Sequence, residues 1–123
     1  MKNLLTQMAF MLAVLLIVHP ASSTANEIVP INTIITSPVN FDGKEVRLRG
    51  VAKNPTRLPM IDLKSYMLED TSGEIMVLTE SNLPRMNEEF IVRVRIKSLA
   101  IINGEALGLA AIELERYEQQ QEI

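Results

Sequence analysis

The chain has 123 residues and a formal net charge of −3, with 12 basic groups, 15 acidic groups and no cysteine. This length favours one domain, and the absence of cysteine excludes a disulfide framework. All 15 acidic groups and 11 of the basic groups follow residue 25, so the remainder of the chain has a net charge of −4. Because binding to polyanions relies on Lys and Arg, such a domain is a poor general binder of nucleic acid.

The first 25 residues have the pattern of a secretory signal peptide. Lys2 provides a positive start, residues 4–18 are apolar, and Ser23 and Ala25 place small residues before a cleavage site after Ala25. The apolar run is shorter than the roughly 20 residues of a membrane-spanning helix. We therefore predict an exported protein, periplasmic or secreted, from which residues 1–25 are removed. An uncleaved N-terminal anchor is the alternative.

Residues 26–40 are predicted to form a leader with a short helical segment. Residues 31–36 suit one or two helical turns. Ser37 is predicted to end them, because the residue before proline avoids the helical region. Residues 39–44 form a turn cluster that leads into the main domain.

Five strands are predicted within the domain, which we place at residues 41–117. Apolar and polar residues alternate in short runs that turn residues separate. The ranges are about 45–53, 63–70, 74–80, 89–100 and 106–116. Residues 54–60 and 81–87 form proline-containing loops, and the second is too short for a helix. Residues 118–123 form a polar C-terminal tail.

Two motifs carry a family resemblance. Residues 43–51 read Gly-Lys-x-Val-x-Leu-x-Gly-Val, and residues 66–77 read Tyr-x-Leu-x-Asp-x-Ser-Gly-x-Ile-x-Val. Together they resemble the OB domains of the tRNA-anticodon-binding-like group and of exported bacterial OB-fold proteins, over residues 31–116. The resemblance implies an all-β fold, a small five-stranded antiparallel OB-type barrel. We expect the first and fourth strands to pair, because closure removes open edges. OB domains bind many unrelated ligands, so function is left open.

The residue types do not favour catalysis. The single histidine, His19, lies in the predicted signal peptide, so the mature domain lacks the usual nucleophile–base pairs and zinc ligands. We predict no enzyme activity, no catalytic residue, no cofactor and no metal. Residues 70–74 offer oxygen atoms that suit calcium, but a turn capped by Asp70 is the interpretation that we favour, with Gly73 at positive φ.

The outer face of the second and third strands is the predicted binding surface. By alternation, Met67, Met76 and Leu78 point outward, beside Arg57 and Leu58 of the 54–60 loop. Methionine-bearing apolar surfaces suit adaptable protein contacts. We predict a protein or cell-envelope partner here, with the domain a monomer or weak homodimer. The alternative is that these are scattered apolar residues without a role.

A stripe of cations provides a second hypothesis, the binding of single-stranded nucleic acid or another polyanion. Its members come from the first and fourth strands: Arg47, Arg49, Arg93, Arg95 and Lys97. We favour neutralisation of this stripe by acids of the fifth strand. We predict a three-residue loop at 103–105, or a bulge that restores the same phase, with Gly104 or a neighbour at positive φ. Arg95 would then lie opposite Glu113 and Arg93 opposite Glu115, with apolar residues paired inside.

Overall fold

The computed structural model describes residues 27–58 and 62–118, so the predicted signal peptide lies outside the described residues. Within these ranges, two short helices precede five strands. The elements are α2 (Ile31–Thr36), α3 (Pro38–Phe41), β1 (Glu45–Arg57), β2 (Lys64–Glu69), β3 (Glu74–Thr79), β4 (Glu89–Ile102) and β5 (Glu105–Tyr117). The predicted order of elements is confirmed, with one helix more than expected.

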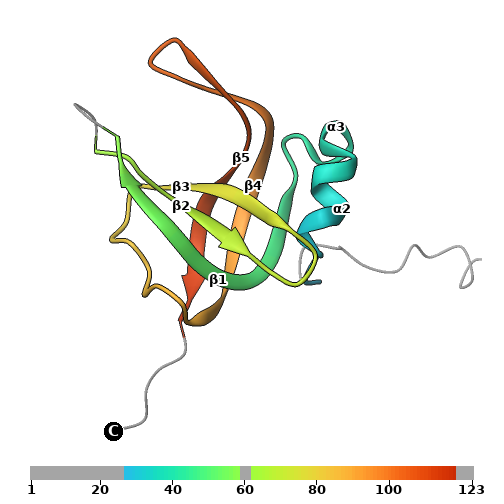
Figure 1. Ribbon diagram of the computed structural model, residues 1–123. Coiled ribbons are helices and arrows are strands. Elements are labelled where there is room, and N and C mark those ends of the chain that lie inside the picture. The colour runs from blue at the N-terminus through green and yellow to red at the C-terminus, as the bar shows by residue number, and fades with distance from the viewer. Residues whose placement is uncertain (1–26, 59–61, 119–123) are drawn as a thin grey trace, which may run out of the picture.

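The strands form one mixed sheet that closes on itself in the order β1-β2-β3-β5-β4 (Figure 1). β1 pairs with β4 in antiparallel fashion, as predicted. The expectation of a fully antiparallel sheet is wrong for one pair, because β3 and β5 run parallel through Val77–Ala111 and Leu78–Ile112. Directions cannot alternate all the way around a ring of five strands. A parallel pair is therefore unavoidable.

The interior of the closed sheet is filled by apolar side chains at alternate strand positions, as the sequence predicts. Tyr66 and Phe90 are the buried aromatic residues, with ring centroids 6.0 Å apart. Around them pack Ile31, Ile34, Val46, Leu48, Ala52, Leu68, Ile75, Val77, Val92, Val94, Ile96 and Ala111. The two isoleucines of α2 are fully buried, so this helix covers one end of the core.

β1 is longer than predicted. The expected loop after Lys53 is instead a continuation of the strand to Arg57. Asn54 has a φ of 50°, and the pairing with β2 shifts between Lys53 and Thr56. Asparagine tolerates positive φ better than most residues, so it permits a bulge where proline-rich sequence suggests that the strand ends.

The helical segment also differs from the prediction. α2 ends at Thr36 as expected, but α3 begins directly at Pro38. Proline is well suited to the first position of a helix, because its missing N–H would have no partner there. Ser37 and Pro38, which end α2, therefore also begin α3.

The hairpin of β4 and β5 continues past the ring, at the top of Figure 1. We call residues 98–109 the hairpin arm. Its turn is the two-residue Asn103-Gly104, with φ values of 51° and 78°, and Ile102 pairs with Glu105. The prediction of a three-residue loop is wrong, because Asn-Gly adopts the tight turn whose twist matches the strands.

The two-residue turn sets the register of β5 as far as Glu113. Two register shifts, between Ala100 and Ile101 and between Lys97 and Ala100, cancel each other, so Arg95 lies opposite Ile112 and not Glu113. A third shift, between Arg93 and Val94, inserts one residue in β5. Arg93 therefore lies opposite Glu115 as predicted.

Candidate partner-binding face

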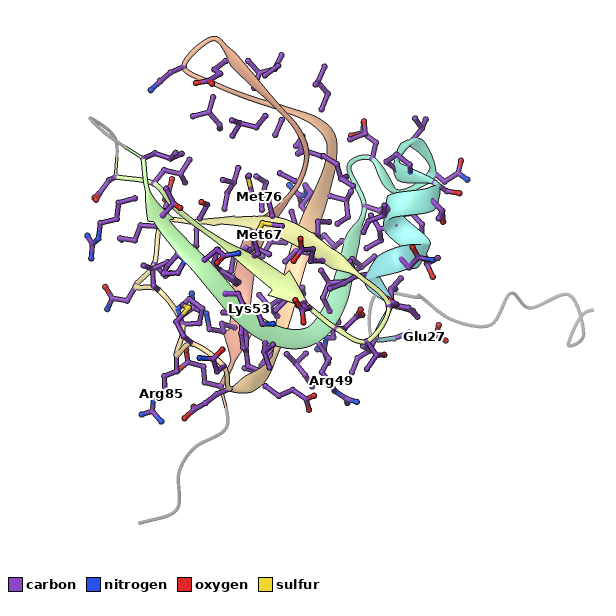
Figure 2. All side chains as sticks on the ribbon, viewed as in Figure 1. Glu27, Arg49, Lys53, Met67, Met76 and Arg85 are labelled. Atoms are coloured by element: carbon purple, nitrogen blue, oxygen red, sulfur yellow. The ribbon has the colours of Figure 1, made fainter. Side chains whose placement is uncertain are left out.

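Met67 and Met76 are neighbours on the outer side of β2 and β3. They are direct partners in the register, and Lys53 of β1 lies opposite Met67 on its other side. Both methionines are half-buried, and Figure 2 shows them close together where β2 and β3 cross the middle of the sheet. Lys53 pairs with Glu69 at 2.9 Å. The predicted methionine surface is therefore present, and an ion pair lies beside it.

Leu78 lies on the same side but is only 1% exposed. It belongs to a second apolar cluster with Ala100 and Ala110, which Leu63, Met76, Ile102, Leu107 and Ile112 extend. The prediction of Leu78 as an accessible contact is wrong, because residues of the hairpin arm cover it. The alternation pattern predicts on which side of the sheet Leu78 lies. Its exposure depends on residues of the hairpin arm, more than 20 positions later in the chain.

This second cluster connects the methionine pair to the arm, since Met76 packs against it. Leu99 and Ile101 of the arm remain 58% and 59% exposed. They flank Ala100, which packs in the cluster, and are not themselves part of it. The outer face of β2 and β3 and the cluster under the arm therefore form one continuous apolar region. Exposed apolar regions of this kind are typical of interaction sites.

β1 ends at Arg57, and Leu58 follows it, at the margin of this face. Arg57 is exposed and Leu58 is half-buried. The backbone N–H of Leu58 donates to Leu63 at 3.0 Å, which brings together the two sides of the loop. Residues 59 and 60 of the predicted 54–60 loop lie outside the described residues.

Two of the predicted cations are neutralised by Glu45. Its carboxylate accepts from Arg95 at 2.7 Å and from Arg93 at 3.1 Å. Arg93 also reaches Glu115 at 3.4 Å, so neutralisation by β5 is confirmed for that arginine. The predicted pairing of Arg95 with Glu113 is wrong, and Glu45 takes the place of Glu113.

Arg47 is held by an aromatic ring. Its guanidinium carbon lies 5.0 Å from the ring centroid of Tyr117, a distance at which cation–π attraction contributes. Arg49 and Lys97 are exposed, and neither has an ion pair with another described residue. Three of the five stripe cations therefore have no ion pair within the described chain, and of these three Arg47 is the one that an aromatic ring holds.

A buried polar cluster involves Glu113, which was predicted to point outward. Its side chain is 4% exposed and accepts from the hydroxyls of Tyr66 and Thr79, each at 2.6 Å. Arg116, 12% exposed, donates to both carboxylate oxygens at 3.0 and 2.9 Å. Burial and the neighbouring Glu113 carboxylate raise the pKa of Tyr66. The Glu-x-x-Arg spacing is visible in the sequence, but the register that places Glu113 opposite the buried Val94 is not.

Asp70 organises the β2–β3 turn. Its carboxylate accepts from the backbone N–H groups of Ser72 and Gly73 at 2.7 and 2.9 Å. The other oxygen accepts from the N–H of Ile31, at the start of α2, at 3.0 Å. The carboxylate of Asp70 therefore caps the turn, which is the interpretation favoured from the sequence. Gly73 does not have the predicted positive φ.

Hollows among the described residues lie away from this face. One, of about 490 Å³, lies between Pro30, Arg49 and Ser72. Another, of about 580 Å³, lies between Asn82, Arg85 and Arg116. Within residues 27–58 and 62–118, no group of three or more His, Cys, Asp or Glu residues is placed to hold a metal ion. In the same ranges no helix has the length and apolar character to cross a membrane.

No family model matches the sequence, and no curated protein matches it. Among solved structures, the fold is similar to part of RecJ from Thermus thermophilus, in a crystal structure with Mn²⁺. That match has a TM-score of 0.51 and 13% identity, and covers 76% of this chain and 15% of RecJ. A protein described as an aspartyl-tRNA synthetase, from Leishmania major Friedlin, matches with a TM-score of 0.50 and 11% identity. This second match covers 81% of this chain and 22% of the synthetase. These likenesses concern the fold, and the chain spans less than a quarter of either protein.

Proposed function

We propose that this chain is an exported OB-type binding module that contacts a protein or cell-envelope partner. The contact surface is the outer face of β2 and β3 around Met67 and Met76, with Arg57 and Leu58 at its margin. The observation that carries the proposal is the continuity of the methionine pair with the apolar cluster under the hairpin arm. A flexible thioether surface adapts to a partner's shape, which suits protein contact. The proposed module is not an enzyme.

Polyanion binding is the second candidate. The similarity of fold to an aspartyl-tRNA synthetase and the free cations Arg49 and Lys97 favour it. Against it, Arg93 and Arg95 are already held by Glu45. The face of β2 and β3 also offers methionines where single-strand binders usually stack bases on aromatic rings. We therefore rank this candidate second.

Affinity capture with matched variants separates the two. The purified domain is immobilised, and envelope extract is applied at low and at high salt. Met76→Asp places a charge in the apolar face and is expected to abolish retention of the partner. Val39→Asp is the control, because Val39 is 78% exposed and lies on α3. Retention through the apolar face is expected to change little with salt.

Binding through the cations predicts the opposite pattern. Affinity for a single-stranded oligonucleotide would fall with salt at a logarithmic slope of about −0.7 for each phosphate contact. It would be lost in a variant that carries Arg49→Glu and Lys97→Glu, and Met76→Asp would leave it intact. Tight oligonucleotide binding at physiological salt with this pattern would overturn the leading proposal.

A further inference from the structure

One edge of β4 is unpaired in the hairpin arm. β1 pairs with β4 as far as Arg95. The N–H of Ile96 donates to the carbonyl of Lys44, and the carbonyl of Ile96 accepts the N–H of Gly43. The carboxylate of Asp42 accepts the N–H of Ser98 at 2.9 Å. Beyond Ser98, no described strand pairs with this edge. We call residues 99–102 on this side the open edge of β4.

The side chains beside the open edge are apolar. Leu99 and Ile101 are 58% and 59% exposed, whereas Ala100 between them is 5% exposed and packs in the second apolar cluster. Exposed strand edges usually carry lysine, proline or a covering loop that prevents pairing with another chain. Residues 99–102 contain no lysine or proline, and no described loop covers this edge.

The open edge is complementary to itself. In an antiparallel pair centred on Ala100, Leu99 of one copy lies opposite Ile101 of the other, and the two-fold axis repeats this apolar pair. Because residues 42–44 occupy this side of β4 as far as Ser98, the pairing is confined to residues 99–101 of each copy, and no charged residue lies within it.

We propose that the protein forms a homodimer by antiparallel pairing of the open edge of β4 with the same edge of a second copy. The apolar pairs between Leu99 and Ile101 stabilise it, and backbone hydrogen bonds extend each arm by a strand of the other. The contact leaves Met67 and Met76 free, so it does not depend on the proposed function.

Sedimentation equilibrium over a range of protein concentrations tests this dimer. The protein is expected to show a concentration-dependent mass between one and two copies. Ile101→Lys puts a charge on the edge and is expected to weaken association at least roughly tenfold. Val39→Lys, an exposed apolar position on α3, is expected to leave the mass unchanged. A monomer at all concentrations, or association that Ile101→Lys does not weaken, would overturn the proposal.

Disulfide cross-linking tests the register. The chain has no cysteine, so introduced thiols can be placed singly. A mixture of Leu99→Cys and Ile101→Cys proteins is expected to form mixed cross-linked dimers faster than either protein alone, because directly opposite residues have the Cα separation of about 5.5 Å that a disulfide needs. Equal rates in all three samples would contradict the proposed pairing.

Discussion

The phenol oxygen of Tyr66 donates a 2.6 Å hydrogen bond to the carboxylate of Glu113, joining the middle of β2 to β5. Arg116 approaches the same group, with its guanidinium carbon 5.9 Å from the Tyr66 ring centroid. Since β5 pairs with β3 through only two residue pairs, this cluster adds side-chain bonds near the shortest junction of the ring. Glu113 therefore contributes to closure of the sheet.

Glu113→Ala is expected to lower the free energy of unfolding by about 3 kcal/mol, because the buried hydroxyls of Tyr66 and Thr79 would lose their acceptor. Arg116 would keep only its ion pair with the more exposed Glu118. Urea denaturation measures the loss. Glu115→Ala is the control: Glu115 is 52% exposed and its ion pair with Arg93 lies at the surface, where such pairs contribute about 0–1 kcal/mol. Equal losses in the two variants would show that the buried cluster does not stabilise the fold.

Asp70 is expected to make stability depend on acidity. Partial burial opposes its ionisation, but hydrogen bonds from Ser72, Ile31 and Gly73 outweigh this and lower the pKa of Asp70 below its ordinary value of 3.8. A lowered folded-state pKa gives stability that is present above 3.8 and is lost as the pH falls through the folded-state pKa.

Asp70→Asn is therefore expected to be less stable than the unmodified protein at pH 7, and the difference should shrink below pH 3.8. Thermal unfolding over a pH series checks this. Glu74→Gln changes an exposed acid in the same turn and should follow the unmodified protein. A difference that stays constant with pH would refute the assignment.

Gly50 allows β1 to pass close to β2. A Cβ added there would clash with the carbonyl oxygen of Glu69, and a backbone atom cannot move away as a side chain can. Gly50→Ala is expected to cost about 1–3 kcal/mol of stability. Gly73→Ala is the matched control, since its nearest neighbour is the end of the Ile35 side chain at 3.2 Å. Chemical denaturation should show the larger loss at Gly50.

If the protein is exported as proposed, its form in the native cell is expected to be shorter than the full chain. Cleavage after Ala25 would give a mature form that begins at Asn26. Mass spectrometry of the intact protein from the native envelope measures this directly. A mass that still includes residues 4–18 would indicate a retained anchor.

Alternation along single strands was sufficient to predict which residues of β1 to β4 face inward, as Val46 and Leu68 show. It failed for Glu113, because the two-residue turn sets Glu113 opposite the inward-facing Val94, and the partners Tyr66 and Thr79 lie more than 30 positions earlier. A bulge near Leu114 then changes the phase, so Glu115 lies on the outer side. It failed for Leu78 because exposure depends on another segment. Local patterns predict the side of a residue, whereas bulges and cover depend on the assembled sheet.

The pairing of β1 with β4 has a consequence for the order of folding. Glu45 binds Arg93 across 48 positions of the chain, and β5 must arrive before the ring can close. Contacts so distant in sequence slow folding, because a long loop must be ordered before they form. A chain that emerges from its N-terminus, whether from a ribosome or through a membrane, therefore cannot complete this domain until residue 117 or so is free. A molecule truncated within the hairpin arm is expected to remain a substrate for proteases.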